Sequence, residues 1–347
     1  MTRAQGAGPD PSAARELAVL VRGHRLTDLV TTAARLGIPD AIAAGASDVA
    51  TLAETTRTHA PTLLRLLRAL AAAGVVHERG DGGFELTAVG DLMRTGVPGS
   101  LAPWIAVTDR QYLRDSWRHL EHSVRTGENA FKAVHGEDIW SWRGARPDEA
   151  ATFDAAMTAQ SAGIGQAVAD AFDFAGATVV ADIAGGAGSL LAGVLRARPH
   201  LRGILFDQPS VVERTVEVRS PDLAGRCDVV GGDFFESVPG GADVYVMKAI
   251  LHDWEDAEAI AILRNIRRVI PSGGSLLVVE RVVGPPNEDI EGRLSDLHML
   301  VMPGGRERTR QEWTALLASG GFRLDDVRSL RAAWELIVAS PATEGAS

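Results

Sequence analysis

The sequence lacks the features on which several classes of protein depend. Cys227 is the only cysteine among 347 residues, so no disulfide can form within the chain, and its place at the start of a hydrophobic run favours a buried structural role. No hydrophobic run reaches the length of a membrane span, and the first residues lack the hydrophobic segment of a signal peptide. We therefore expect a protein of the cytoplasm with no membrane partner.

Positive charge is scarce relative to negative charge. The formal net charge is −10 at pH 7, whereas a phosphate backbone is bound by positively charged surfaces. We therefore expect no nucleic-acid partner. Hydrophobic residues make up 46% and charged residues 23% of the chain, as in globular proteins, and 347 residues predict more than one domain. Residues 1–13 and 342–347 are small and polar, and we expect them to fray.

The first hundred residues combine helical patterns with a short hairpin. Hydrophobic residues recur at helical spacing over residues 15–44, and residues 47–90 predict two short helices, with Ser47 and Thr58 as possible caps, then a hairpin turning at Gly80–Gly83. Helix, helix and hairpin in this order form a winged helix, which makes a DNA-binding regulator one hypothesis. Leucines cover most of the second helix, which favours a core or dimer-forming role instead.

Residues 101–173 predict helices that hold most of the aromatic side chains. These side chains can form a core between domains or roof a pocket for a flat aromatic substrate, and the sequence leaves both interpretations open. The aromatic residues are Trp104, Tyr112, Trp117, Phe131, Trp140, Trp142, Phe153 and Phe172.

After residue 174 hydrophobic runs alternate with helical segments, which predicts parallel strands joined by right-handed crossovers. The chain ends on two strand-like segments, 321–330 and 332–340, which predict an antiparallel pair at one edge of the sheet. The fold class is therefore α/β, a Rossmann-like parallel sheet with one antiparallel edge strand. The predicted parallel strands lie at residues 179–184, 203–206, 227–230, 243–248 and 275–283.

A glycine-rich turn follows the first of these strands. The stretch VVADIAGGAGS (179–189) passes through Gly185, Gly186 and Gly188 directly into a helical pattern, and glycines suit a sharp turn that a ligand approaches closely. The spacing does not match the dinucleotide fingerprint G-x-G-x-x-G, and the lysine of a P-loop is missing. Asp182 and Asp207, which end neighbouring strands, would repel a phosphate but suit ribose hydroxyls and a cationic ligand such as S-adenosylmethionine.

The segment MKAILHDWEDAEA (247–259) holds the densest group of polar residues. His252 lies at a strand-to-helix junction and can accept a phenol proton near neutral pH. Glu280 ends the next strand, and Glu307 lies in a Gly-Gly-Arg-Glu-Arg-Thr loop. Neighbouring parallel strands are about 5 Å apart, so these carboxylates can reach and orient the histidine. The acidic residues lack the spacing of histidine-rich metal sites, so we expect no metal.

Six stretches of the sequence resemble the class I S-adenosylmethionine-dependent O-methyltransferases of the plant phenolic and bacterial natural-product type. The resemblance covers nearly the whole chain and implies a class I methyltransferase sheet, S-adenosylmethionine as cofactor, a small aromatic substrate and a homodimer. It implies a winged-helix-like dimerisation domain over 1–100, a helical linker and pocket region over 101–173, and a catalytic domain over 174–347. The stretches are DIAGGAGSLL, FDQP, GGDFFESVP, MKAILHDW, LLVVE and DLHMLVMPGGRERTRQEW.

The resemblance also implies a role for single residues. His252 would be the general base that deprotonates a phenolic hydroxyl, positioned by Glu280 and Glu307. Asp207 would bind the ribose, and the other polar and aromatic residues around the strand ends would hold the rest of the cofactor. The implied cofactor-binding residues are Asp182, Gly185, Gly186, Gly188, Asp207, Gln208, Asp233, Phe234, Lys248 and Trp254. The substrate-contacting candidates are Trp104, Phe153, Met157, Asp253, Met299 and Met302.

Three positions depart from the family pattern, and two other functions stay open. Ala184 and Ala187 stand where the family often has glycine or a larger residue, and Gln208 replaces a frequent leucine.

Bacterial relatives of this fold include enzymes that use the bound cofactor for hydroxylation, decarboxylation or cyclisation, so a non-methylating tailoring step is one alternative. The winged-helix regulator is the other. Retention of His252, Glu280 and Glu307 favours methyl transfer.

Overall fold

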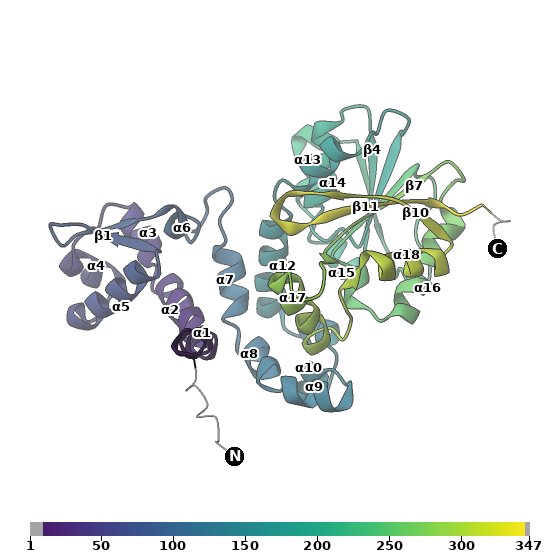
Figure 1. The fold of residues 1–347 in the computed structure, drawn as a ribbon. Coiled ribbons are helices and arrows are strands. Elements are labelled where there is room, and N and C mark those ends of the chain that lie inside the picture. Colours follow the sequence, from purple (N-terminus) through teal and green to yellow (C-terminus); the bar gives the residue numbers. More distant parts are fainter. Residues whose placement is uncertain (1–9, 344–347) are drawn as a thin grey trace, which may run out of the picture. The chain divides into compact units, whose positions relative to one another are not determined.

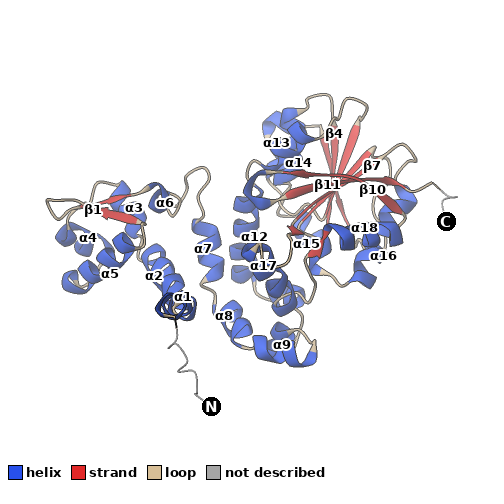
Figure 2. Cartoon of the chain, in the orientation of Figure 1, coloured by secondary structure: helices blue, strands red, loops and turns tan. Residues whose placement is uncertain are grey.

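The computed structural model describes residues 10–343, which form two compact units, one ending at Arg110 and one beginning at Gln111. Figures 1 and 2 show the helices and strands of both units. The outer parts of the two tails that we expected to fray, residues 1–9 and 344–347, lie outside the described residues. The expectation was wrong for residues 11–13, which begin helix α1 because the Asp10 carboxylate accepts a hydrogen bond from the N–H of Ser12 at 2.9 Å.

The first unit has the predicted order of helix, helix and hairpin. Leu63, Leu67 and Leu70 of α5 are buried in its core, in agreement with a core role for this helix. The predicted cap Ser47 is wrong, since Asp48 caps α4, and α5 follows His59 without a side-chain cap, so Thr58 is wrong as well. The elements are α1 (Pro11–Val21), α2 (Gly23–Arg35), α3 (Ile38–Ala43), α4 (Val49–Thr56), α5 (Ala60–Ala72), β1 (Val76–Glu78), β2 (Phe84–Leu86), α6 (Ala88–Asp91) and α7 (Ala102–Thr108).

The second unit begins with six helices and continues into the α/β fold. The first helices are α8 (Gln111–Arg118), α9 (Leu120–Thr126), α10 (Ala130–His135), α11 (Ile139–Gly144), α12 (Pro147–Ser161) and α13 (Ile164–Ala171). The sheet consists of β3 (Val179–Ile183), β4 (Arg202–Asp207), β5 (Cys227–Gly231), β6 (Val244–Lys248), β7 (Ser275–Glu280), β10 (Phe322–Ser329) and β11 (Glu335–Pro341). The later helices are α14 (Ser189–Ala197), α15 (Pro209–Val212), α16 (Asp256–Val269), α17 (Ile290–Val301) and α18 (Arg310–Ser319), with a short 3-10 turn η3 (Leu251–Asp253) before α16.

The seven strands lie in the order β10-β11-β7-β6-β3-β4-β5. All five predicted parallel strands are present and pair in parallel with their neighbours. The antiparallel pair at one edge is also confirmed, because β11 pairs antiparallel with both β10 and β7. The single reversed strand is therefore β11, next to the edge, whereas the edge strand β10 runs with the others.

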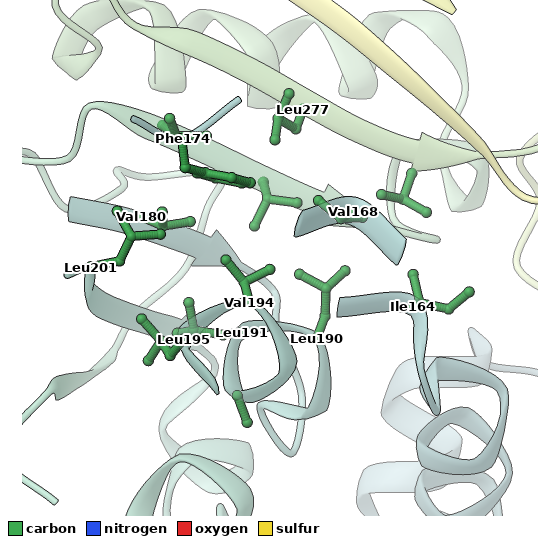
Figure 3. Close-up of a cluster of buried hydrophobic side chains, with 14 of the residues drawn as sticks. Ile164, Val168, Phe174, Val180, Leu190, Leu191, Val194, Leu195, Leu201 and Leu277 are labelled. Carbon is green, nitrogen blue, oxygen red and sulfur yellow. The ribbon is translucent and has the colours of Figure 1, made fainter. Parts of the chain in front are cut away.

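Both faces of the sheet are covered by helices, as the near-continuous hydrophobic runs of its strands require. Successive residues of a strand point to opposite faces, so Val180 packs toward α13 and α14 while Ala181 packs toward α16 and α18. Figure 3 shows the first of these cores, where side chains of α13 and α14 meet Val180 and Leu277. None of the described helices is long and hydrophobic enough to span a membrane.

The single cysteine begins β5. Burial raises the pKa of the Cys227 thiol to about 11, so the thiolate is scarce at neutral pH. The low reactivity agrees with the structural role that we predicted, but the side chain is half-buried and not fully buried as expected.

Candidate active site

The predicted polar residues gather at the carboxyl ends of neighbouring parallel strands. Asp182 lies one residue before the end of β3, and Asp207, Lys248 and Glu280 are the last residues of β4, β6 and β7. Because β4, β3, β6 and β7 are consecutive in the sheet, these groups share one edge. Ligands of open α/β sheets bind at this edge.

The glycine-rich turn after β3 needs backbone angles that glycine adopts most easily. Ala184, Gly186 and Gly188 have φ of 58°, 58° and 85°, in the left-handed region where a side chain costs about 1 kcal/mol or more. The N–H of Gly186 donates to Oδ2 of Asp207 at 2.8 Å, and the N–H of Gln208 donates to Oδ1 at 2.7 Å. Asp207 therefore holds the turn, and its oxygens keep lone pairs that can accept ribose hydroxyls.

We expect Gly185→Ala to destabilise this turn by steric overlap. A Cβ at this position would overlap the side chain of Leu205 and lie 2.7 Å from the carboxyl carbon of Asp182. Gly186→Ala is a matched control, since its Cβ would meet no atom within 4 Å and only its positive φ opposes it. We expect a lower melting temperature for Gly185→Ala than for Gly186→Ala, and about tenfold weaker binding of S-adenosylhomocysteine by calorimetry. Equal stability and affinity of the two variants would contradict the overlap.

Asp182 is a buried acid whose negative charge is only partly compensated. Its side chain is 1% exposed, and Oδ2 has no hydrogen-bond partner within residues 10–343. Burial, reinforced by the charge of Asp207, raises the pKa of Asp182 to about 7. A cation bound beside the glycine turn would favour the ionised form of this acid. The turn therefore fits a ligand with an ammonium group, as S-adenosylmethionine has.

Three aromatic side chains pack together near the carboxyl end of β5. The ring centroids of Phe234 and Trp254 are 6.1 Å apart, and Phe235 lies 4.8 Å from each of them. The side chain of Asp233 forms a hydrogen bond within its own loop, where Oδ1 accepts the N–H of Phe235 at 2.8 Å. The structure thus brings Phe234 and Trp254 together as predicted and adds Phe235, which sequence reasoning missed. Their contact with an adenine ring stays a prediction, as does that of Asp233.

Lys248 and Gln208, which lie at the carboxyl ends of β6 and β4, differ in their contacts and in their exposure. The ammonium of Lys248 lies 4.4 Å from the ring centroid of Trp334, a cation–π contact with the residue that precedes β11. Burial lowers the pKa of Lys248 to about 8. Gln208 is exposed, and its backbone supplies the contact with Asp207. Cofactor contacts by these two side chains stay predictions.

His252, Glu280 and Glu307 form a buried group, with exposed fractions of 7%, 0% and 2%. Nδ1 of His252 lies 3.0 Å from Oε1 of Glu307 and 3.2 Å from Oε2 of Glu280. Two carboxylate oxygens at Nδ1 require a proton there, so the other ring nitrogen, Nε2, is the one that can take up a further proton. Asp253 lies near Nε2, with Oδ1 3.6 Å away. The predicted positioning of the histidine by two carboxylates therefore has the required geometry.

The two glutamates differ in their partners. Oε1 of Glu280 accepts the N–H groups of Ile250 and Leu251, each at 2.9 Å, whereas Oε1 of Glu307 accepts the hydroxyl of Ser295 at 2.6 Å. Burial raises the pKa of Glu280. Burial also opposes the ionised form of Glu307, but the charge of His252 and the hydrogen bonds from His252 and Ser295 outweigh burial and lower its pKa.

The imidazole itself is held in its charged form. Burial disfavours the charge, but the negative charges of Glu280 and Glu307 outweigh it and raise the pKa of His252 to about 10. The same three side chains offer ligand atoms within 4.8 Å of one another, a spacing that a metal ion could also use. Oε1 of each glutamate accepts hydrogen bonds, but Oε2 of Glu280 and Oε2 of Glu307 have no hydrogen-bond partner within residues 10–343. The absence of a metal therefore stays a prediction.

Arg308 holds the turn that carries His252. It is 0% exposed, and its guanidinium donates to the carbonyl oxygens of Leu251 and Trp254, each at 2.9 Å, on either side of the histidine. The same group pairs with Asp256 at 2.8 Å. Arg306 adds a backbone hydrogen bond to the carbonyl of His252 at 2.8 Å. The loop that supplies Glu307 is thus fastened to the turn that supplies the histidine.

The substrate-contacting candidates fall in different places. The ring centroid of Phe153, on α12, lies 3.6 Å from the guanidinium carbon of Arg143. Met299, on α17, is 8% exposed. Met302 is 1% exposed in a hydrophobic cluster with Phe131, so it contributes to a core. Substrate contacts stay predictions for all six candidates. Of the remaining three, Trp104 on α7 of the first unit is exposed, whereas Met157 on α12 and Asp253 beside His252 are half-buried.

Several residues of this region escaped the sequence analysis. Arg308 belongs to a stretch that carries the family resemblance, and Ser295 directly precedes that stretch. The order of residues along the chain did not show which groups either side chain contacts. Trp334 and Phe235 were visible only as aromatic residues beside a strand. Arg143 was one of many arginines, and only the fold shows that it is buried, at 8% exposure.

Comparisons with known proteins agree with this geometry. Residues 117–323 match the model of the O-methyltransferase domain, and residues 19–96 match that of the O-methyltransferase dimerisation domain. Phenazine O-methyltransferase PhzM of Lysobacter antibioticus is 38% identical, over 93% of this chain and 94% of the relative. The O-demethylpuromycin-O-methyltransferase of Streptomyces alboniger is 40% identical, over 91% and 86%. The solved structure of CalO1, a methyltransferase in calicheamicin biosynthesis bound to S-adenosylhomocysteine, has a TM-score of 0.87 at 34% identity and covers 96% of this chain and 99% of that chain.

Proposed function

Because the chain belongs to the O-methyltransferase family and is an S-adenosylmethionine-dependent O-methyltransferase, we propose that it methylates a phenolic hydroxyl of an aromatic natural product with His252 as general base. The observation that carries this proposal is the buried group at the end of β6 and β7. There Nδ1 of His252 faces Glu307 at 3.0 Å and Glu280 at 3.2 Å, which leaves Nε2 to accept a proton.

Some residues at the strand ends would bind the cofactor, and others would transfer the proton. S-adenosylmethionine supplies a methyl group on a positively charged sulfur, which is a good electrophile. Asp182 and Asp207, both acidic and beside the glycine turn, would bind its ammonium and ribose groups. Nε2 of His252 takes the phenolic proton as the oxygen attacks, and Glu280 and Glu307 stabilise the resulting imidazolium. The protein otherwise contributes by aligning the two reactants.

The substrate class rests on the named relatives. PhzM acts on a phenazine and the Streptomyces alboniger enzyme on O-demethylpuromycin, and both are O-methyltransferases of aromatic compounds. One relative of 35% identity is named aclacinomycin 10-hydroxylase RdmB, from Streptomyces purpurascens, so hydroxylation is the second candidate. A retained base beside two carboxylates favours methyl transfer, since removal of a phenolic proton is the step that a histidine serves.

We further propose that the enzyme is a homodimer of the cytoplasm. Leu17, Leu20 and Val21 of α1 are 61%, 77% and 66% exposed, a hydrophobic surface that a second copy can cover. The regulator hypothesis is weakened by Arg68 on α5, which makes a bidentate pair with Glu78 at 2.9 to 3.1 Å and so cannot offer its full charge to a phosphate. Light scattering that finds a monomer at micromolar concentration would contradict the dimer.

Transfer of a labelled methyl group tests the proposed function. The purified protein is incubated with S-adenosylmethionine carrying a deuterated methyl group and a panel of phenols, hydroxynaphthalenes and anthraquinones, and products are identified by mass spectrometry. We expect a mass increase of one deuterated methyl group at a phenolic oxygen, unchanged after dialysis against EDTA. A product with added oxygen and no label would favour hydroxylation. Loss of activity with EDTA, restored by a divalent cation, would instead assign a metal to the His252 group.

A further inference from the structure

Arg143 is a buried arginine whose charge is not matched by an acid. It lies on α11 and is 8% exposed. None of the ion pairs formed within the described residues includes it, and its Nε has no hydrogen-bond partner there. Since arginine is charged at every physiological pH and an isolated buried charge is costly, such a residue calls for an anion or a special environment.

The environment of Arg143 is aromatic. Its guanidinium carbon lies 3.6 Å from the ring centroid of Phe153, 5.5 Å from that of Trp140 and 5.8 Å from that of Tyr112. Aromatic faces attract the cation but accept none of its N–H groups strongly. The hydroxyl of Tyr112 is close enough to favour the charged guanidinium, yet it too is buried without a hydrogen-bond partner in the described part of the chain. Nε of Arg143 and the hydroxyl of Tyr112 are therefore two neighbouring buried polar groups that can both donate to an anion.

The nearest acids are occupied elsewhere. Asp253 and Asp154 are the carboxylates whose charges reach Arg143. Asp154 pairs with Arg214 at 3.5 Å, and Asp253 lies 3.6 Å from Nε2 of His252. Neither of them forms an ion pair with Arg143 among the described residues. Arg143 therefore keeps a positive charge that these neighbours attenuate but do not bind.

The surroundings place Arg143 next to the catalytic group. Tyr112, whose ring centroid lies 5.8 Å from the guanidinium carbon of Arg143, packs in one hydrophobic cluster with Val301 of α17. Ser295 of the same helix donates to Glu307 of the catalytic group at 2.6 Å. His298 adds no second positive charge, because the indole N–H of Trp117 donates to its Nδ1 at 3.1 Å and so requires that nitrogen to be unprotonated. The unmatched cation, the aromatic rings and the base thus belong to one region of the second unit.

We propose that Arg143 binds a carboxylate on the acceptor, so that the substrate is an aromatic acid bearing a phenolic hydroxyl. The proposal rests on the proposed O-methylation and narrows its substrate class. A carboxylate accepts two parallel N–H groups of a guanidinium, and the hydroxyl of Tyr112 can donate to the same anion. The flat ring of the acceptor then lies among side chains that are themselves aromatic, with its hydroxyl free for His252.

Matched pairs of acids and amides test this assignment. The wild-type protein, saturated with S-adenosylhomocysteine, is titrated by calorimetry with hydroxybenzoic and hydroxynaphthoic acids and with the corresponding primary carboxamides. We expect the acid of at least one pair to bind about 30-fold more tightly than its amide. Arg143→Met should remove this preference by weakening the acid alone, and Arg143→Lys should restore part of it, since lysine keeps the charge without the bidentate geometry.

Arg146→Met is the matched control. Arg146 also stacks on an aromatic ring, that of Trp142 at 4.2 Å, but its side chain is 43% exposed and pairs with Glu137. We expect this variant to keep the preference for acids. A wild-type protein without the preference, or an Arg143→Met variant that loses acid and amide affinity equally, would show that Arg143 only packs among the aromatic rings. Methyl transfer by the wild-type protein to any phenol of the panel separates this outcome from failure of the proposed function, because that measurement involves no change at Arg143.

Discussion

His252→Ala is expected to lower kcat by about 10³-fold with a phenolic acceptor, within the range that general bases contribute. The variant removes the Nε2 that takes the proton, while the glycine turn after β3 and Asp207 at the end of β4 stay intact. Binding of S-adenosylhomocysteine, measured by calorimetry, should therefore change little. His200→Ala is the control, because His200 bonds the carbonyl of Phe174 and takes no part in the site.

The acidity of the acceptor gives this prediction a second readout. A nitro-substituted phenol is already ionised at neutral pH and needs no base, so the defect of His252→Ala should shrink strongly with such an acceptor. An equal loss with ordinary and nitro-substituted phenols would show that His252 only maintains the structure. A kcat reduced less than tenfold with an ordinary phenol would exclude it as the base.

The same residue sets the expected pH dependence. Because Glu280 and Glu307 raise the pKa of His252 to about 10 in the free protein, the imidazole is protonated at pH 7 and only a small fraction can accept a proton. The value of kcat/KM reports the free enzyme, so we expect it to rise with pH and to level off near pH 10. Binding of a cationic cofactor favours the neutral imidazole, so kcat should level off at a lower pH. His252→Ala should lose the part of this dependence that the imidazole sets, and the rise that remains should follow the pKa of the acceptor phenol.

Much of this site follows from the order of residues alone, and the reason is topological. Parallel strands end at one edge, so Asp182, Asp207 and Glu280 had to meet there once the strands were recognised. The glycine turn was recognisable because few other residues adopt its backbone angles, although Ala184 does so at a cost. His252 and Glu280 follow adjacent strands, β6 and β7, which explains why their proximity was predictable.

Other parts depend on contacts that join distant segments. Glu307 reaches His252 only because Arg308 and the backbone of Arg306 fasten its loop to the turn after β6. Lys248 lies on Trp334 because β11 inserts beside β7, and the sequence placed the antiparallel strand at the edge instead. Burial of Arg143 is likewise a property of the packed helices. These contacts and this burial depend on segments that are distant in the sequence, so the periodicity of hydrophobic residues could not predict them.

Glu280→Gln is expected to impair catalysis more than Glu307→Gln, although both remove one negative charge. Oε1 of Glu280 accepts two backbone N–H groups at 2.9 Å, so an amide oxygen must remain there and the amide N–H₂ group must take the place of Oε2, 3.2 Å from Nδ1 of His252. A donor then faces the Nδ1–H donor, which disfavours the tautomer that leaves Nε2 free. We expect a loss of about 10²-fold in kcat.

Glu307→Gln keeps an acceptor where the histidine needs one. The hydroxyl of Ser295 donates to Oε1 of Glu307 at 2.6 Å and so keeps the amide oxygen at this position, still 3.0 Å from Nδ1 of His252. Only the charge is lost, so we expect about a tenfold reduction in kcat and a kcat/KM profile that levels off at lower pH. Glu335→Gln, on the strand that pairs with β7 opposite Glu280, serves as the control for the exchange itself. Equal losses for the two variants would show that charge, and not the proton on Nδ1, governs how these carboxylates act on the histidine, and a larger loss for Glu307→Gln would contradict the proposed orientation of the two amides.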